Sequence, residues 1–410
     1  MERISSKNLL FLTAIRITDP EEKGIYTDLI RKFRDEGHQV FVVCPEERKY
    51  AGKTRLETVK GVSVLYVKSL NLQKTGLIEK GLATLSLSWL LLRAVKKYFL
   101  EIKFDLVLYS TPPITYNAVI KFIKVRDRAV SYLLLKDIFP QNAVDLGMIK
   151  EDGLLHRYFK RIEKKLYELS DVIGCMSEAN RTYLLHHHPY LSPEKVDINP
   201  NSIDLKWVDS PKESPNKIRK SLGIQDDALI CIYGGNIGKP QGINFLIEIL
   251  KHYKKDNRIF FVIVGDGTEF QKLNNWFEQN RPVNAILMRE LPKKDFDELA
   301  CHANAGLILL DPRFTIPNFP SRLLSYLENK MSVWAATDTN TDIGEIVRQN
   351  EFGFWVKNGD LASFIEEVER ELTNRHLNPN RGEIGYNYMK VNFGVNRSYE
   401  RIISHMNNII

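Results

Sequence analysis

Apolar residues along this chain form short continuous runs, and most runs are followed by a segment in which apolar positions recur every three or four residues. Runs rich in Val, Ile and Leu are typical of strands buried on both faces of a parallel sheet, and the following segments indicate helices that cover it. The runs predict two series of strands, at residues 9–17, 40–45, 62–67, 106–110, 130–138, 172–176 and 196–198, and then at 229–233, 259–264, 286–288, 306–310, 333–336 and 354–356.

The two series imply two α/β domains. Helical patterns separate the strands of the first series, at 25–36, 78–100, 116–124, 154–169 and 178–186. A stretch rich in Pro, Ser, Asp and Asn, residues 200–215, lies between the series, and 410 residues suit two cores better than one. We therefore expect one domain at 1–205 and a second at 206–385. Each would be a doubly wound, Rossmann-like parallel sheet. Such sheets bind ligands at the carboxyl ends of their strands, so the expected site is an inter-domain cleft.

Composition points to an intracellular globular protein. Apolar residues make up 43% and charged residues 27% of the chain, which is ordinary for such a protein. The four cysteines show no metal-ligand spacing and lie in apolar runs, as expected of free thiols in a reducing compartment. The apolar run 82–92 is about half as long as a membrane span, and 9–12 is too short for a signal peptide. These features predict a cytoplasmic protein.

Charge is unevenly distributed. The whole formal excess of +7 lies in residues 1–205, while 206–410 are balanced, so the first half is expected to face an anionic partner. Nucleic acid usually requires more charge and a recognisable module, whereas a membrane surface or a phosphorylated acceptor requires less. The helix at 78–103 combines an apolar stripe with a basic end. It is either an interfacial helix on anionic lipid or a core helix with a solvated end.

Three glycine- or proline-containing loops in the second half carry the candidate chemistry. Each follows an apolar run and precedes a helical pattern, which is how α/β domains present backbone N–H groups to phosphate. The first contains Asn236, Gly238 and the cation Lys239; the second is Gly265-Asp266-Gly267; the third is Pro320-Ser321-Arg322. In the third loop, Ser321 is expected to cap the helix while Arg322 binds the diphosphate.

Two further positions are added to this donor site. The turn at Gly24 would bring the first helix of the chain close to the donor phosphate. Arg289 ends a strand at a position where backbone groups could hydrogen-bond the edge of a nucleotide base. For both Gly24 and the 265–267 loop, a plain turn before a helix explains the residues nearly as well.

The order of these motifs resembles that of GT-B glycosyltransferases, specifically the retaining family-4 enzymes of bacterial capsule and O-antigen synthesis. The resemblance spans nearly the whole chain and includes segments 137–141, 199–204, 291–293 and 319–327. It implies a GT-B fold, a nucleotide-diphosphate sugar as donor, retention through a front-face pathway, and no metal or other cofactor. It also implies that residues 386–410 form a helix that crosses back to the first domain.

The chain departs from the family pattern at two pairs of positions. Pro317 and Ser325 stand where many members carry a Glu pair, and Asn236 and Gln241 stand where members often carry an Arg and a Lys. Neutral Ser325 and Asn236 can still hydrogen-bond sugar hydroxyls, though more weakly than charged groups. The changes remove two charges of each sign, so we expect rearranged donor contacts rather than lost activity.

Asp137 is the candidate catalytic residue on the acceptor side. It ends a strongly apolar run, where a carboxylate is unfavourable unless it serves a function or caps the next element. It could orient or deprotonate the acceptor hydroxyl. The triplet His186-His187-His188 has poor spacing for one metal site on a helix face, so no metal is expected.

The sequence therefore predicts a hexosyl- or N-acetylhexosaminyl-transferase. It would move a sugar from a UDP-sugar to a lipid-linked saccharide in bacterial surface polysaccharide synthesis. It would act in the cytoplasm, peripherally on the inner face of the cell membrane, without nucleic acid. A nucleotide-sugar 2-epimerase of the same fold and a non-catalytic GT-B binding subunit are the alternatives.

Overall fold

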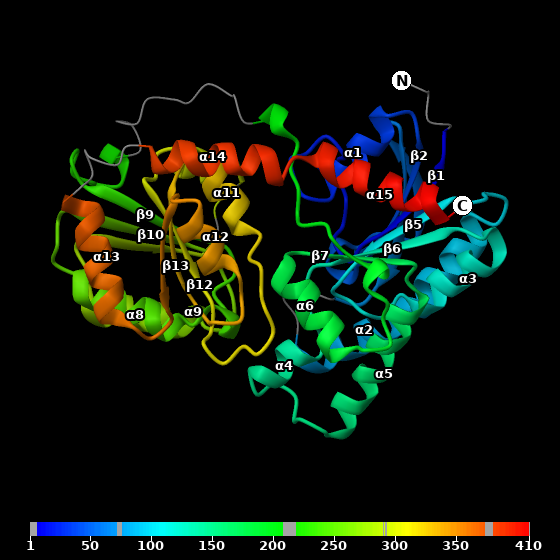
Figure 1. Cartoon of the computed structure of the whole chain (residues 1–410), viewed down its shortest axis with the longest axis horizontal. Coiled ribbons are helices and arrows are strands. Elements are labelled where there is room, and N and C mark those ends of the chain that lie inside the picture. The colour runs from blue at the N-terminus through cyan, green and yellow to red at the C-terminus, as the bar shows by residue number, and fades with distance from the viewer. Residues whose placement is uncertain are drawn as a thin grey trace. The chain divides into compact units, whose positions relative to one another are not determined.

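The computed structural model describes residues 6–71, 76–207, 219–289, 291, 293–373 and 380–409 (Figure 1). Contacts divide the chain into two compact units. Unit 1 contains Met1–Asp204 and Phe393–Ile410, and unit 2 contains Leu205–Asn392. No helix among the described residues is both long and apolar enough to span a bilayer.

Unit 1 is built on an eight-stranded sheet in the order β3-β4-β2-β1-β5-β6-β7-β8, in which only β3 is antiparallel to its neighbour. The strands are β1 (Asn8–Leu12), β2 (Gln39–Glu47), β3 (Arg55–Val59), β4 (Val62–Ser69), β5 (Leu106–Ser110), β6 (Val130–Leu135), β7 (Val172–Cys175) and β8 (Val196–Ile198). Strand β3 was not predicted, because it is a polar edge strand with no apolar run. It pairs with β4 through a turn in which Lys60 and Gly61 have positive φ.

Helices cover both faces of this sheet (Figure 1). They are α1 (Thr27–Asp35), α2 (Leu77–Tyr98), α3 (Asn117–Asp127), α4 (Gln141–Asp145), α5 (Leu154–Leu169), α6 (Glu178–His187) and α15 (Val395–Ile409). On one face α15 packs against α1, where the Tyr399 and Phe33 rings meet edge to face at 4.9 Å. Elsewhere α2 packs against α3 and α3 against α5, so these three helices form a continuous layer. Short 3-10 turns lie at Arg48–Tyr50 and Pro193–Lys195.

Unit 2 contains six strands, all parallel, in the order β11-β10-β9-β12-β13-β14. They are β9 (Leu229–Gly234), β10 (Ile259–Val264), β11 (Ala285–Met288), β12 (Ala305–Leu309), β13 (Ser332–Thr337) and β14 (Gly353–Lys357). The helices are α8 (Ile243–Tyr253), α9 (Phe270–Asn280), α10 (Lys293–Ala300), α11 (Arg322–Glu328), α12 (Ile343–Gln349), α13 (Leu361–Thr373) and α14 (Arg381–Asn392), with 3-10 turns at Leu205–Trp207 and Lys239–Gln241.

Both sheets have the strand order of doubly wound folds. In unit 1 the chain leaves β1 toward β2 on one side and returns to β5 on the other. In unit 2 it leaves β9 toward β10 and returns to β12. The loops that follow these paired strands therefore diverge and open a crevice at the carboxyl edge of each sheet. The sequence prediction of two doubly wound parallel sheets is confirmed.

Three boundaries differ from those expected. Strand β6 ends at Leu135 rather than 138, because the backbone N–H groups of Lys136 and Asp137 donate to the Thr111 hydroxyl instead of to a strand. Strand β1 ends at Leu12 rather than 17. The C-terminal segment joins unit 1 only from Phe393, because α14 packs against α11 within unit 2.

Candidate functional site

The loop that follows β9 lies at the crevice of unit 2. Gly235 begins it with a φ of +114°, a left-handed conformation that favours glycine, and its N–H donates to the Val264 carbonyl. The buried Tyr233 donates its hydroxyl to the Asn236 carbonyl at 2.6 Å. The loop is therefore fixed from below by side-chain and backbone hydrogen bonds.

The loop that follows β10 packs directly against this first loop. A Cβ on Gly265 would lie 1.8 Å from the Gly235 carbonyl oxygen, so only glycine permits the approach. The Ile237 N–H donates to the Asp266 carbonyl at 2.9 Å, and the Glu269 N–H donates to the Ile237 carbonyl at 2.9 Å. The two loops are thus joined by backbone hydrogen bonds into one surface.

Side chains of the first loop lie at this junction. An added Cβ on Gly238 would meet the Asn236 side-chain nitrogen at 2.8 Å, and one on Gly267 would meet its oxygen at 2.6 Å. The Asn236 amide therefore lies between the two glycines. Lys239 is exposed, and it makes no ion pair or side-chain hydrogen bond with the residues that the structure describes.

The first residue of α11, Arg322, brings the third loop to the same place. Its guanidinium stacks over the Tyr233 ring at 4.4 Å from the centroid, and its Nη2 donates to Gln241 Oε1 at 2.8 Å. A Cβ on Gly235 would lie 3.7 Å from that Nη2. Arg322 Nη1 is buried and has no hydrogen-bond partner among the described residues. A buried cationic donor without a partner is unfavourable, and an anion such as a phosphate oxygen would satisfy it.

The expected helix cap at Ser321 is not formed. Its backbone is already helical, with φ −63° and ψ −21°, and its exposed side chain accepts no capping hydrogen bond. A capping residue needs an extended backbone for its oxygen to reach back to the helix. The N–H groups of Leu323 and Leu324 are also taken, by the Pro320 and Ser321 carbonyls. The Arg322 side chain, rather than the helix end, is therefore the chemical feature of this loop.

Two of the four positions that depart from the family pattern, Pro317 and Ser325, lie on the same segment as Arg322. Ser325 is half-buried and one turn beyond Arg322 on α11, so both side chains share one face of the helix. Pro317 is buried in the loop before α11. Ser325 thus lies on the same face of α11 as Arg322.

Arg289 meets this cluster only at its edge, through Asp266 of the second loop. It follows β11, the edge strand of the sheet, two strands from β9. Its guanidinium pairs with the Asp266 carboxylate at 3.3 Å and lies over the Phe270 ring at 4.1 Å from the centroid. The Arg289 side chain is 57% exposed and that of Asp266 28%, so solvent screens the pair and it contributes little stability. Asp266 is thereby neutralised at the rim of the glycine loops.

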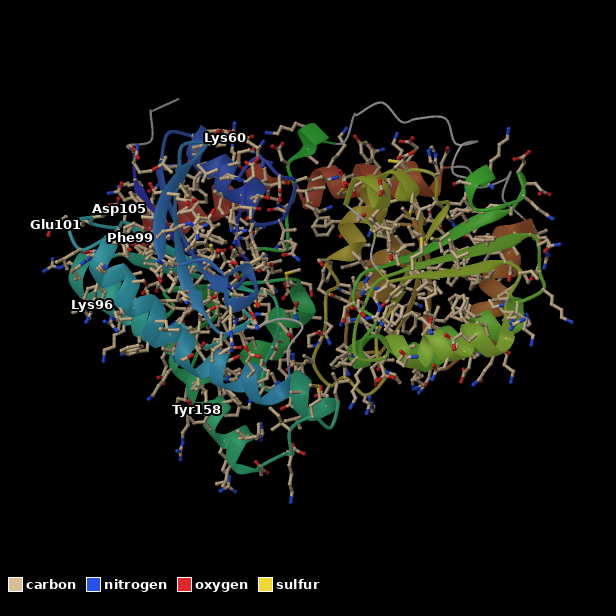
Figure 2. The ribbon with its side chains drawn as sticks, turned by 180° about the vertical axis from the view of Figure 1, so that it is seen from behind. Lys60, Lys96, Phe99, Glu101, Asp105 and Tyr158 are labelled. Carbon is tan, nitrogen blue, oxygen red and sulfur yellow. The ribbon has the colours of Figure 1, made fainter. Side chains whose placement is uncertain are left out.

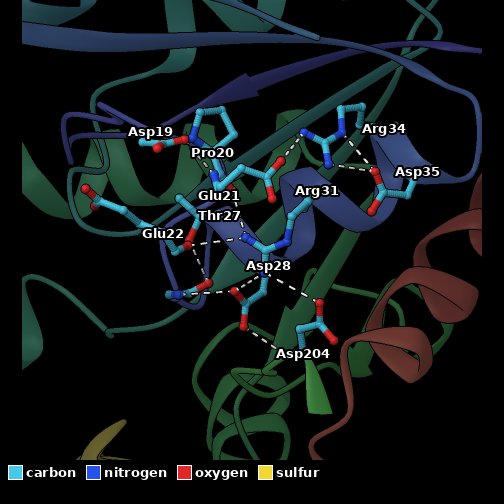
Figure 3. A network of polar contacts seen from close by, with 11 residues as sticks. Asp19, Pro20, Glu21, Glu22, Thr27, Asp28, Arg31, Arg34, Asp35 and Asp204 are labelled. Atoms are coloured by element: carbon cyan, nitrogen blue, oxygen red, sulfur yellow. Dashed lines mark hydrogen bonds and ion pairs between the residues drawn. The ribbon is translucent and has the colours of Figure 1, made fainter. Parts of the chain in front are cut away.

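In unit 1, the Gly24 turn is held by a buried ion pair (Figure 3). The Gly24 N–H donates to Asp28 Oδ1 at 3.1 Å. The approach of the first helix to the donor phosphate stays a prediction. The buried Arg31 donates to the same Oδ1 at 2.6 Å and to the Pro20 carbonyl at 2.7 Å. Asp28 Oδ2 accepts the Asp204 N–H at 2.8 Å, which ties the end of unit 1 to this turn.

Asp137 lies beyond the carboxyl end of β6. Its Oδ2 accepts a 2.7 Å hydrogen bond from the Asn142 side chain, so it braces α4 without capping its backbone. Burial raises the pKa of Asp137 to about 6. The carboxyl therefore titrates near neutral pH, as a general base must.

Sequence reasoning missed Lys136, which precedes Asp137. Burial lowers its pKa to about 7, and no ion pair or hydrogen bond joins its side-chain nitrogen to the described residues. The signal was a lysine and an aspartate together at the end of the apolar run Val130–Leu135. The predicted strand at 130–138 includes Lys136, so this residue was assigned to the strand and not to the site.

The described residues contain no group of three or more His, Cys, Asp or Glu side chains suited to a metal ion. The three consecutive histidines have different neighbours. His187 stacks on Tyr183 with ring centroids 3.9 Å apart, while His188 meets Tyr167 edge to face. Burial lowers the pKa of His188 to about 4.

Replacing Gly265 with alanine should separate the two glycine loops, because the new Cβ would overlap a backbone carbonyl that cannot rotate away. We expect Gly265→Ala to lower the free energy of unfolding by about 1–3 kcal/mol and to weaken nucleotide binding. Urea denaturation and calorimetric titration measure both. Gly81→Ala, within α2 where an added Cβ would meet no atom within 4 Å, is the control and should be neutral or slightly stabilising. Equal behaviour of the two variants would contradict the close packing of the loops.

Replacing Arg322 with alanine should weaken binding of a nucleoside diphosphate by about 1.5–3 kcal/mol, because a charge-assisted hydrogen bond is lost. Calorimetric titration checks this value. Arg313→Ala is the matched control, since Arg313 lies in the same loop but pairs with Asp311 at 2.8 Å. If both variants bind the diphosphate like the wild type, Arg322 does not contact it.

Comparison with known proteins agrees with this architecture. The family model for glycosyltransferase family 4 matches residues 25–207, and the model for glycosyl transferases group 1 matches residues 214–388. WbjE of Pseudomonas aeruginosa, whose name assigns it to the glycosyltransferases, is 24% identical over 310 residues, which are 72% of this chain and 73% of WbjE. WcaI of Escherichia coli K12, named for colanic acid biosynthesis, is 24% identical over 160 residues, 38% of each chain.

A solved structure shows the same fold. Anabaena HepE in complex with UDP-glucose superposes with a TM-score of 0.71 at 13% identity, covering 98% of this chain and 100% of HepE. The two family models follow one another along nearly the whole chain and coincide with the two sheets. The chain therefore belongs to the glycosyltransferases that combine a family-4 domain with a group-1 domain, and it has the GT-B fold.

Proposed function

We propose that this glycosyltransferase moves a sugar from a UDP-sugar to a lipid-linked saccharide during synthesis of a bacterial surface polysaccharide, with retention of the anomeric configuration. The observation that carries the proposal is the buried Nη1 of Arg322, which has no hydrogen-bond partner in the described part of the chain and adjoins two interlocked glycine loops at the crevice of unit 2. The UDP-glucose bound by HepE and the colanic acid role in the name of WcaI support the choice of donor and pathway.

In this proposal the diphosphate lies on the β9 and β10 loops. Arg322 donates to a phosphate oxygen, and the exposed ammonium of Lys239 supplies a second positive charge. The Asn236 amide and the Ser325 hydroxyl bind sugar hydroxyls in place of the Glu and Arg of other family members. Hydrogen bonds from these neutral groups are weaker than those from charged ones. The charge-assisted bond between Arg322 and the donor diphosphate compensates for the difference.

On the acceptor side, Asp137 orients the attacking hydroxyl, and the leaving diphosphate takes part in removing its proton. The elevated pKa of Asp137 makes its carboxylate basic enough to share that proton near neutral pH. Lys136 precedes it in the chain, and because burial lowers the pKa of this lysine to about 7, an anionic acceptor would favour its charged form. The loop that follows β5 adds two buried, unpartnered hydroxyls, Thr115 Oγ1 and Tyr116 OH, which match a polyhydroxylated substrate.

A lipid-linked acceptor requires the enzyme to work at a membrane surface, and we propose peripheral contact with the anionic inner face of the cell membrane. Helix α2 fits such a role. Its residues Ala83, Leu87 and Leu91 pack in the core, whereas Leu85 and Trp89 on the other side are exposed. The interpretation of α2 as a core helix and its interpretation as an interfacial helix are thus compatible, because each applies to a different face.

Incubating the enzyme with labelled UDP-sugars and lipid-linked oligosaccharides tests the proposed function. We expect one UDP-sugar to label the lipid fraction, and the product to keep the donor's anomeric configuration by NMR. Labelling from GDP- or dTDP-sugars in place of UDP-sugars would contradict the donor, and an inverted product would contradict retention.

Asp137→Asn should lower turnover by roughly 10²–10⁴-fold while sparing donor binding, because the neutral amide cannot accept the proton. In the wild type, the rate should fall below pH of about 6, where Asp137 becomes protonated and loses its basic form. The variant should lack this acid limb. Initial rates from pH 5 to 8 measure both effects.

Asn142→Ala is the matched control for the titration. Its side chain donates to the Asp137 carboxylate and thereby lowers the pKa of that group. Removing this hydrogen bond should raise the pKa, so the acid limb of the rate profile should move to higher pH. A fully active Asp137→Asn enzyme would exclude the residue from catalysis.

A further inference from the structure

The first turn of α5 exposes two leucines that the core does not use. Leu154 is 87% exposed and Leu155 62%, and Tyr158, one turn further on, is also exposed. Met148, in the loop that leads into this helix, is exposed as well. Figure 2 labels Tyr158 on α5 of unit 1. Large apolar side chains gathered in this way on a surface mark a contact with a partner or a membrane.

The rest of α5 is firmly held, so this exposure is not a sign of a detached helix. Its inner face buries His156, Leu166 and Tyr167. Phe159 meets Phe139 edge to face at 5.0 Å, and Asn117 of α3 donates to the Ile162 carbonyl at 3.1 Å. The exposed leucines therefore project from a rigid support.

Basic residues follow the apolar turn along the same helix. Arg157, Arg161 and Lys165 are exposed and form no ion pair with any described residue. With a rise of about 1.5 Å per residue, Arg161 and Lys165 lie roughly 10 and 16 Å from Leu154 along the helix axis. The helix thus presents an apolar end with positive charge behind it. This order matches the acyl boundary and the anionic headgroups of a bilayer.

Helix α2 repeats the order in the same helical layer, which α3 completes between the two. Its exposed Trp89 is followed by Arg93, whose guanidinium lies 5.5 Å from the Trp89 ring centroid, and then by the exposed Lys96 (Figure 2). Tryptophan beside arginine is typical of a membrane interface. Charge complementarity therefore favours an anionic bilayer over a second copy of this basic chain.

We infer that the N-terminal end of α5 is the main membrane anchor of the enzyme. Leu154, Leu155 and Tyr158 enter the acyl boundary of an anionic bilayer, while Arg157 and Arg161 contact lipid phosphates. This inference rests on the proposed function, because a lipid-linked acceptor gives the enzyme a reason to dock. It goes further by assigning the anchor to α5, a helix that sequence reasoning had placed only in the fold.

Vesicle co-sedimentation of the full chain tests the inference, with pure phosphatidylcholine vesicles compared with vesicles that also contain phosphatidylglycerol. We expect binding to the anionic vesicles and at least tenfold weaker binding by the variant Leu154→Ser/Leu155→Ser/Tyr158→Ser. Val283→Ser/Val391→Ser, which removes two similarly exposed apolar residues from unit 2, is the control and should bind like the wild type. The variant Arg157→Gln/Arg161→Gln/Lys165→Gln should lose the preference for anionic lipid.

Equal vesicle binding by the triple serine variant and the wild type would overturn the inference, and so would a wild type that binds no vesicle. A dimer that the serine variant disperses, without vesicle binding, would assign the surface to self-association instead. Unchanged UDP affinity and thermal unfolding in the variant show that the fold and donor site are intact. Vesicle binding by an enzyme that transfers no sugar would refute the proposed function and leave the anchor standing.

Discussion

The donor side of this enzyme depends on the closeness of two backbone loops beside the central strand β9. Because the chain leaves β9 toward β10 and returns to β12, its loop lies where neighbouring connections diverge. Gly265 has no Cβ, so the β10 loop can lie against the Gly235 carbonyl and bond to Ile237. Tyr233 then supports both the loop, through its hydroxyl, and Arg322, through its ring. A cation is thereby held beside exposed backbone, with one buried donor left for an anion.

Unit 1 uses a different device to fix its crevice. A buried Arg31–Asp28 pair holds the Gly24 turn and the backbone of Asp204, the last residue of this unit before the chain enters unit 2. Breaking such a pair by removing one partner leaves an uncompensated charge, so the turn and this end of the unit are coupled. Across the same sheet, the Thr111 hydroxyl ends β6 and sets the positions of Lys136 and Asp137. Polar groups thus define both sides of this crevice, where the acceptor is proposed to bind.

Sequence pattern predicted most of the fold because buried parallel strands are continuous apolar runs, and β9 to β14 all lie within a residue or two of the expected positions. The sequence prediction failed where tertiary contacts determine the local structure. The polar edge strand β3 had no apolar signal, and the backbone of Ser321 is helical, so its expected cap is absent. The hydrogen bond from the Gly24 N–H to Asp28 is also a contact that spacing cannot reveal, while the role of this turn beside the donor stays a prediction. Lys136 was overlooked because it adjoins an apolar run, although the loops around Asn236, Gly265 and Arg322 do come together as expected.

The relatives that match this chain are named for sugar transfer, which favours neither the epimerase nor the binding-subunit alternative.

The central claim is that the loops of unit 2 hold the diphosphate of the donor. The most direct test is the thermal shift of the wild-type protein with UDP, compared with UMP and uridine at the same millimolar concentrations. A ligand at a hundred times its dissociation constant stabilises a protein by about 2.7 kcal/mol, which is readily measured. The account predicts a clear upward shift with UDP, a much smaller one with UMP and almost none with uridine. Equal shifts with all three, or none with UDP, would contradict a diphosphate site at Arg322.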